Sequence, residues 1–89
     1  MEIQERLLNK IIKLARQYGV TRLILFGSML DDPSIAQDID LACDGLTGWN
    51  FYKFGAKLEE ELNLSVDLIP LTPTTLFTKY IESKGKSIL

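Results

Sequence analysis

Two aspartates, Asp38 and Asp40, stand one residue apart in an otherwise apolar segment that runs to Cys43. Side chains of a β-strand alternate between its two faces, so these carboxylates would point to the same side of a sheet. Two like charges side by side repel each other, and folding alone gives no reason to place them there. A divalent cation would explain them, because it is bound by carboxylate oxygens. The simpler alternative is that Asp38 occupies a turn and Asp40 an exposed strand position.

A third acid, Asp67, lies between Val66 and Leu68 in a later apolar segment, and it joins the first two if the two segments pair side by side. Two carboxylates about 4 Å apart repel by about 4 kcal/mol at an effective dielectric constant near 20. Three together would raise one another's pKa unless a cation neutralised them. The sequence contains no histidine, so a metal would be held by oxygen ligands, which favours magnesium, manganese or calcium.

Gly27 and Ser28 follow the apolar segment that ends at Phe26, and nine residues separate Ser28 from Asp38. A glycine lets a phosphate approach the backbone closely. A serine at a helix start offers its hydroxyl and neighbouring amide groups to an anion. The same pair is common in plain turns. Its meaning therefore depends on its place, after a buried strand and shortly before the two aspartates.

Apolar periodicity and chain breakers predict three helices and three strands. Helices are expected over residues 2–18, about 49–62 and about 74–84, the last beginning at Thr72-Pro73-Thr74. Strands are expected over residues 20–26, 38–43 and 65–71. This order predicts an α+β fold in which a small mixed sheet of three, or four, strands is packed on one face by helices. The aspartates would lie on the open face or at its rim, within a single domain of residues 1–89.

Composition excludes several classes of function. A formal net charge of −2 and a pI of about 5.0 argue against a broad basic surface, so direct DNA binding is not expected. The single cysteine, Cys43, lies in an apolar segment and is predicted to be a buried thiol. No segment has the length of a transmembrane helix and no signal-peptide pattern opens the chain. We therefore expect a cytoplasmic protein without membrane contact.

Together, the Gly27-Ser28 pair, the Asp38-Ile39-Asp40 segment and Asp67 resemble the motifs of the DNA polymerase β-like nucleotidyltransferase superfamily, especially its minimal nucleotidyltransferase (MNT) branch. The resemblance covers the whole chain. It implies that Gly27 and Ser28 contact the triphosphate of ATP or another NTP. It also implies that Asp38 and Asp40 bind Mg²⁺. Asp67 would be the third metal ligand and would activate the acceptor hydroxyl, so that all three aspartates are catalytic.

In the resembled branch, the nucleotidyltransferase is often the antitoxin of a small helical HEPN protein that acts as an RNase toxin. The resemblance therefore implies Mg²⁺-dependent transfer of AMP from ATP to a tyrosine hydroxyl of a HEPN toxin. The chain has 89 residues, about the size of the catalytic module itself, so we expect another protein to present the acceptor.

The chain departs from the family pattern directly after Ser28. Many minimal members continue with Arg-x-Arg-Gly, whereas residues 29–32 are Met-Leu-Asp-Asp. Two basic groups are absent, and two acids stand close to where phosphate should lie. An alternative hypothesis is therefore a catalytically weak or inactive nucleotidyltransferase-like antitoxin that neutralises its partner by binding. Trp49, Phe51 and Tyr52 would support this alternative if they face solvent.

Overall fold

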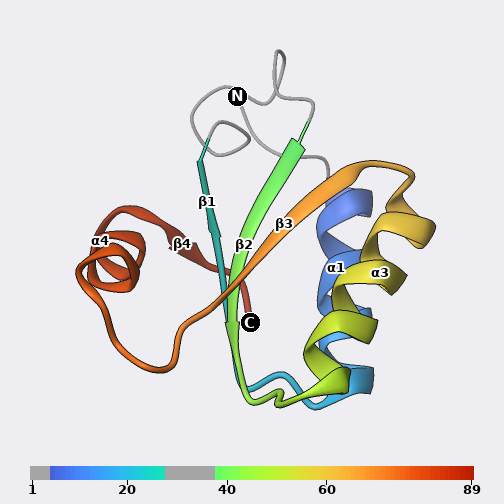
Figure 1. The fold of residues 1–89 in the computed structure, drawn as a ribbon. Coiled ribbons are helices and arrows are strands. Elements are labelled where there is room, and N and C mark those ends of the chain that lie inside the picture. The colour runs from blue at the N-terminus through green and yellow to red at the C-terminus, as the bar shows by residue number, and fades with distance from the viewer. Residues whose placement is uncertain (1–4, 28–37) are drawn as a thin grey trace.

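A mixed sheet with helices on both faces forms the protein (Figure 1), and the computed structural model describes residues 5–27 and 38–89 of it. The elements are α1 (Glu5–Tyr18), β1 (Arg22–Phe26), β2 (Asp38–Asp44), α3 (Trp49–Leu62), β3 (Ser65–Pro70), α4 (Leu76–Lys84) and β4 (Lys86–Ser87). The three predicted helices and three predicted strands are confirmed, with small shifts at their ends. No helix in the described ranges combines the length and apolarity needed to cross a bilayer.

The four strands lie in the order β3-β2-β1-β4. β1 pairs antiparallel with β2 and with β4, whereas β2 and β3 are parallel. The sequence prediction left the fourth strand open, and the structure shows it as a short edge strand. β4 is only Lys86–Ser87, too short and too polar to produce a strand pattern in the sequence. It pairs with Ile24 and Leu25 of β1, and the amide of Ile88 donates to the carbonyl of Leu23 at 2.9 Å.

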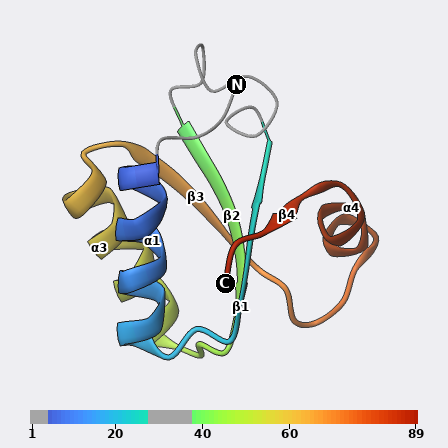
Figure 2. The same cartoon turned by 180° about the vertical axis from the view of Figure 1, so that it is seen from behind.

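The first face of the sheet carries the larger core and is covered by α1 and α3, which lie side by side in both views (Figure 2). Alternate positions of β1 and β2 point into this core. Its buried residues are Ile11, Leu14, Ala15, Val20, Leu23, Leu25, Ile39, Leu41, Cys43, Phe54 and Leu58. The prediction of a buried thiol at Cys43 is confirmed. Burial, with a smaller contribution from the Asp44 charge, raises the pKa of the Cys43 thiol to about 11, so the thiol remains protonated at neutral pH.

The second face of the sheet carries a smaller core beneath α4. Its buried residues are Ile24, Ala42, Leu71 and Ile81, with Phe26 and Ile69 partly buried against them. The prediction that helices cover only one face is corrected here, because α4 lies on the side opposite to α1 and α3 (Figure 1). The physical reason is that the middle of the second face is apolar enough to bury a helix. Asp38 and Asp40 share the strand parity of Ala42, so they lie on this same face.

α4 begins later than predicted. Thr75 is its N-cap, and Thr75 and Thr78 form a reciprocal capping box. The Thr78 amide donates to Thr75 Oγ1 at 3.1 Å, and the Thr75 amide donates to Thr78 Oγ1 at 2.8 Å. The helix start predicted at Thr72-Pro73-Thr74 is therefore wrong by a few residues, because this pair of threonines satisfies the first amides of the helix.

A polar cluster fixes α4 to the end of the sheet where β1 begins and β2 ends. The Arg22 guanidinium ion-pairs with Glu82 of α4 and lies 3.9 Å from Asp44 Oδ2. Thr72 Oγ1 donates a hydrogen bond to Asp44 Oδ1 at 2.9 Å. These side chains are partly exposed, so each ion pair contributes about 1 kcal/mol or less to stability. Their main consequence is the orientation of α4.

Candidate active site

The acidic residues meet because β2 and β3 are parallel neighbours. Asp40 of β2 and Asp67 of β3 are direct partners in the register, and Asp38 pairs with Ser65. Laterally paired residues of adjacent strands project to the same face, so Asp40 and Asp67 stand side by side. Asp38 lies two residues before Asp40 and shares its face. The prediction that the later strand pairs beside the first aspartates is confirmed.

Asp40 is the electrostatic centre of this group. Its carboxyl is half-buried, whereas Asp38 and Asp67 are exposed. Loss of solvation is the largest cause that raises the pKa of Asp40, followed by the charge of Asp67, a side-chain hydrogen bond with Asp67, and the charge of Asp38. Asp40 and Asp67 are therefore in direct contact. A bound cation would favour the ionised carboxylates and offset the repulsion that adds to the effect of burial.

Gly27 closes the site from the end of β1. Its φ is +79°, a left-handed conformation that favours glycine. A Cβ at this position would lie 2.1 Å from Asp40 Oδ2, which is far inside van der Waals contact. The backbone of Gly27 thus passes directly beside the Asp40 carboxylate, and any side chain would displace it. Ser28, the other predicted nucleotide-binding residue, lies outside the described residues.

The carboxylates of Asp40 and Asp67 form a pair, and Asp38 is a neighbour of this pair. The three do not form a preformed metal site. Within residues 5–27 and 38–89, no three carboxylate, thiol or imidazole side chains are gathered closely enough to hold a metal ion. The structure brings Asp40 and Asp67 into contact, while Asp38 acts on Asp40 through its charge. Mg²⁺ is usually bound by one or two carboxylates together with substrate phosphates and water. The Asp40–Asp67 pair beside Gly27 fits that kind of binding.

Aromatic side chains continue the site toward α4. Phe26 is the direct partner of Asp40 in the β1–β2 register. Its ring packs edge-on against Phe77 of α4, with centroids 6.1 Å apart and an interplanar angle of 82°. Phe77 is nevertheless 51% exposed, and Leu76 and Tyr80 are more so. Sequence reasoning did not connect these residues with the acids, because their proximity depends on α4 covering the second face.

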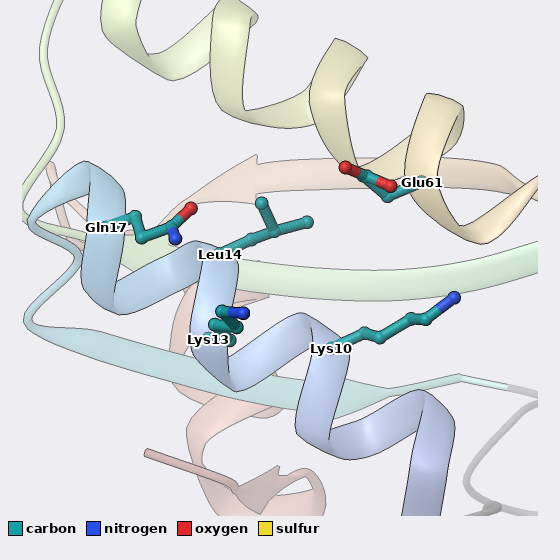
Figure 3. A pocket seen from close by; sticks show the side chains of 5 residues that line it. All are labelled: Lys10, Lys13, Leu14, Gln17 and Glu61. Carbon is teal, nitrogen blue, oxygen red and sulfur yellow. The ribbon is translucent and has the colours of Figure 1, made fainter.

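Other surface features lie away from the carboxylates. A pocket of about 210 Å³ lies on the α1 and α3 side of the sheet. Its lining comes from both helices, as Figure 3 shows, and consists of Lys10, Lys13, Leu14, Gln17 and Glu61. None of the predicted site residues lines it. Trp49 and Tyr52 are exposed at the start of α3, whereas Phe51 is partly buried.

The geometry described so far defines a class of protein. An acidic pair on adjacent parallel strands, a glycine turn beside it and a mixed sheet with helices are features of a nucleotidyltransferase domain. The family model described as "Polymerase beta, Nucleotidyltransferase" matches residues 9–89. The chain therefore belongs to the polymerase β nucleotidyltransferase family. No curated protein matches the chain.

Solved structures extend this result to the MNT branch. An MNT antitoxin in complex with the tri-AMPylated HEPN toxin of Shewanella oneidensis is 28% identical, with a TM-score of 0.78 over 98% of this chain and 72% of that chain. A toxin–antitoxin structure with AMP-PNP is also 28% identical, with a TM-score of 0.76 over 92% of this chain and 72% of that chain. The MntA–HepT complex is 27% identical, with a TM-score of 0.75 over 97% and 72%. The predicted resemblance to MNT antitoxins is confirmed.

Proposed function

We propose that the chain is a Mg²⁺-dependent nucleotidyltransferase that transfers AMP from ATP to a tyrosine hydroxyl of a HEPN toxin and thereby acts as an antitoxin. The observation that carries this proposal is the contact between Asp40 and Asp67, in register on parallel strands and beside the bare backbone of Gly27. Family membership and the similarity to antitoxins crystallised with HEPN toxins and with AMP-PNP support the same conclusion.

The proposed roles follow from position for the aspartates and Gly27, and from the family motif for Ser28, which lies outside the described residues. Asp38, Asp40 and Asp67 hold the metal and the reacting groups, and Gly27 and Ser28 contact the triphosphate. When bound, Mg²⁺ neutralises charge on the triphosphate and stabilises the leaving group. Because Gly27 has no side chain, the Asp40 carboxylate lies directly against its backbone, and a phosphate held next to Asp40 would lie close to Gly27.

The transfer itself is an in-line displacement. The acceptor oxygen attacks the α-phosphorus, one oxygen–phosphorus bond forms, and the bond to the departing pyrophosphate breaks. Asp67 accepts the proton of the acceptor hydroxyl and later releases it to water. Asp67 suits this role because it is the exposed member of the contacting pair, which an incoming hydroxyl can reach, whereas Asp40 is half-buried.

Intact-mass spectrometry tests the proposal directly. The chain is incubated with the HEPN protein encoded beside it, ATP and Mg²⁺, and the HEPN protein is then weighed. We expect a gain of one or more adenylyl groups that disappears with the Asp38→Asn, Asp40→Asn double variant. Asp44→Asn, at the other end of the same strand, is the matched control and should retain transfer. An unchanged HEPN mass with the wild-type chain would refute the enzymatic function.

The second candidate is an antitoxin that acts by masking its partner. Residues 29–32 lack the two arginines that many minimal members have there and contain two acids, and these residues lie outside the described part of the structure. Of the three aromatic residues named for this alternative, Trp49 and Tyr52 are exposed, whereas Phe51 is partly buried. If the double variant still neutralises the toxin in a growth assay, masking is sufficient. If it loses neutralisation together with transfer, the enzymatic function is the relevant one.

A further inference from the structure

We propose that Leu76, Phe77 and Tyr80 form the docking surface for the protein that carries the acceptor hydroxyl, and that this protein covers them with an apolar segment. We call these three residues the α4 apolar surface. The inference rests on the proposed function, because it takes the acceptor to be part of a protein. It adds the position on this chain at which that protein binds.

The α4 apolar surface is the outward side of its helix. Leu76, Phe77 and Tyr80 are 87%, 51% and 59% exposed, whereas Thr78 and Ile81 are the buried residues of α4. The helix therefore turns Thr78 and Ile81 inward, exposes most of Leu76 and Tyr80, and leaves about half of Phe77 exposed. Adjacent exposed apolar side chains of this kind typically mark a protein interaction site, whereas single ones do not.

This surface is continuous with the acidic pair. Phe77 packs on Phe26, Phe26 is the register partner of Asp40, and Asp40 contacts Asp67. These residues therefore occupy neighbouring positions from β3 across β2 and β1 to α4. A partner that rests on Phe77 and Tyr80 reaches the carboxylates by extending along this line.

The orientation of α4 agrees with this placement. Residues advance by about 100° each around an α-helix, so Phe77 and Glu82 lie about 140° apart. Glu82 is bound by Arg22 at the start of β1, and Phe77 lies against Phe26 at the end of β1. One flank of α4 is thus tied to the distal end of the sheet, and the other faces the end that holds the acids.

A protein that covers the α4 apolar surface has to contact more of the chain than these three residues. A typical interface buries about 800 Å² on each partner, with an apolar, aromatic-rich centre and a polar rim. Three side chains supply only the centre, so the contact area has to extend over neighbouring surface. On the side of Phe26 that surface is the acidic site, and there the acceptor hydroxyl would enter at the rim of the interface.

The exposed aromatic pair of α3 is the natural comparison. Trp49 and Tyr52 follow the distal end of β2, which spans seven residues, about 20 Å, from Asp38. They also belong to the helix on the first face of the sheet. A partner centred there would hold its hydroxyl far from Asp40 and Asp67. The two surfaces therefore make opposite predictions about which substitutions weaken the complex.

Calorimetric titration of the cognate HEPN protein distinguishes the two surfaces. We expect the Phe77→Gln, Tyr80→Gln variant to bind it at least about 30-fold more weakly than the wild type, because central aromatic residues dominate binding. The matched Trp49→Gln, Tyr52→Gln variant should stay within about threefold. Affinity for ATP with Mg²⁺ should be unchanged in both. A photo-crosslinking residue at position 80 should capture the HEPN protein, and one at position 52 should not.

The reverse pattern, in which the α3 variant loses binding and the α4 variant keeps it, would overturn the proposal, as would absence of binding by the wild type. Loss of ATP affinity in the α4 variant with unchanged HEPN affinity would also overturn it, because the surface would then belong to the nucleotide site. Binding of the HEPN protein and transfer of AMP are measured in separate experiments. A wild-type chain that binds through α4 but transfers no AMP refutes the enzymatic function and leaves the docking surface standing.

Discussion

The two faces of the sheet are built from the same strands but carry different side chains. The first face is apolar along its length and is sealed by α1 and α3. The second face is divided: Ile24, Ala42 and Ile69 pack under α4, while Asp38, Asp40 and Asp67 occupy the end that faces solvent. In β2, the alternation of a single strand supplies both faces. Ile39 and Leu41 are buried in the first-face core, and the residues that alternate with them, Asp38, Asp40 and Ala42, lie on the second face.

The difference between the two faces explains how a small domain can contain a cluster of like charges. Burial of the Asp40 carboxylate, and then the like charges beside it, oppose its ionised form in the folded chain, and the raised pKa of Asp40 reflects that opposition. Stability has to come from elsewhere, and the first face provides the larger set of fully buried side chains. We therefore expect stability to depend mainly on the first face and activity on the open end of the second.

Replacing one phenylalanine on each face should show the largest difference. Phe54 is fully buried in the first-face core, whereas Phe77 is half-exposed on α4. Phe54→Ala should lower the free energy of unfolding by about 3–5 kcal/mol, through lost burial and the cavity it leaves. Phe77→Ala should cost about 1 kcal/mol or less. Urea denaturation followed by circular dichroism measures both, and equal losses would show that the second face contributes as much as the first.

Replacing one aspartate at each end of β2 should separate activity from stability. Asp40→Asn should reduce the rate of AMP transfer by at least about 100-fold, comparable to the loss of a key charge-stabilising group in other enzymes. The melting temperature should not fall, because a charge whose burial opposes folding is removed. Asp44→Asn should leave the transfer rate nearly unchanged, since Asp44 contacts Arg22 and Thr72 at the distal end. Comparable rate losses in both variants would mean that the acids act only through the fold.

The sequence predicts the structure correctly where hydrophobic periodicity and residue type decide which segments form strands and which face is buried. The alternation around Asp38 and Asp40 and the apolar segments on either side predicted the strands, the buried face and the acids on one side of the sheet. It also identified Asp67, on the condition that its strand pairs beside the first. That condition is a property of tertiary pairing between distant segments, and only the parallel register of β2 and β3 establishes it.

The placement of α4 could not be derived in the same way. Leu76, Phe77, Tyr80 and Ile81 are all apolar, but only Ile81 is buried, together with Thr78. Apolar content indicates an amphipathic helix without saying which sheet face receives it. The contact between Gly27 and the Asp40 carboxylate is likewise a matter of three-dimensional approach, since a glycine before serine is equally typical of a turn.

Ligand binding at the acidic end should change the free energy of unfolding by less than the Phe54→Ala substitution does. With ATP and Mg²⁺ present at 100 times their dissociation constant, stability should rise by about 2.7 kcal/mol, because the ligand binds only the folded chain. For a domain of this size, each kcal/mol corresponds to about 4–8 °C in melting temperature. Removal of Mg²⁺ with EDTA should reverse the shift, and the Asp38→Asn, Asp40→Asn variant should show none. A wild-type melting temperature that does not respond would contradict metal and nucleotide binding at these aspartates.

The smallest expected effect is the pH dependence of folding stability in the metal-free protein. The pKa of Asp40 lies above its ordinary value of 3.8 in the folded chain, so the folded state holds this proton more tightly than the unfolded state. The contribution of Asp40 to stability therefore decreases as pH rises from about 3.8 through the raised pKa, and it stays low above both values. Asp40→Asn cannot titrate, yet its amide can still donate a hydrogen bond to Asp67. The variant should thus gain stability relative to the wild type at pH 7, and the gain should shrink toward pH 4. Parallel melting curves with and without Mg²⁺ measure this difference. A gain that is independent of pH would mean that the charge of Asp40 is already compensated in the metal-free protein.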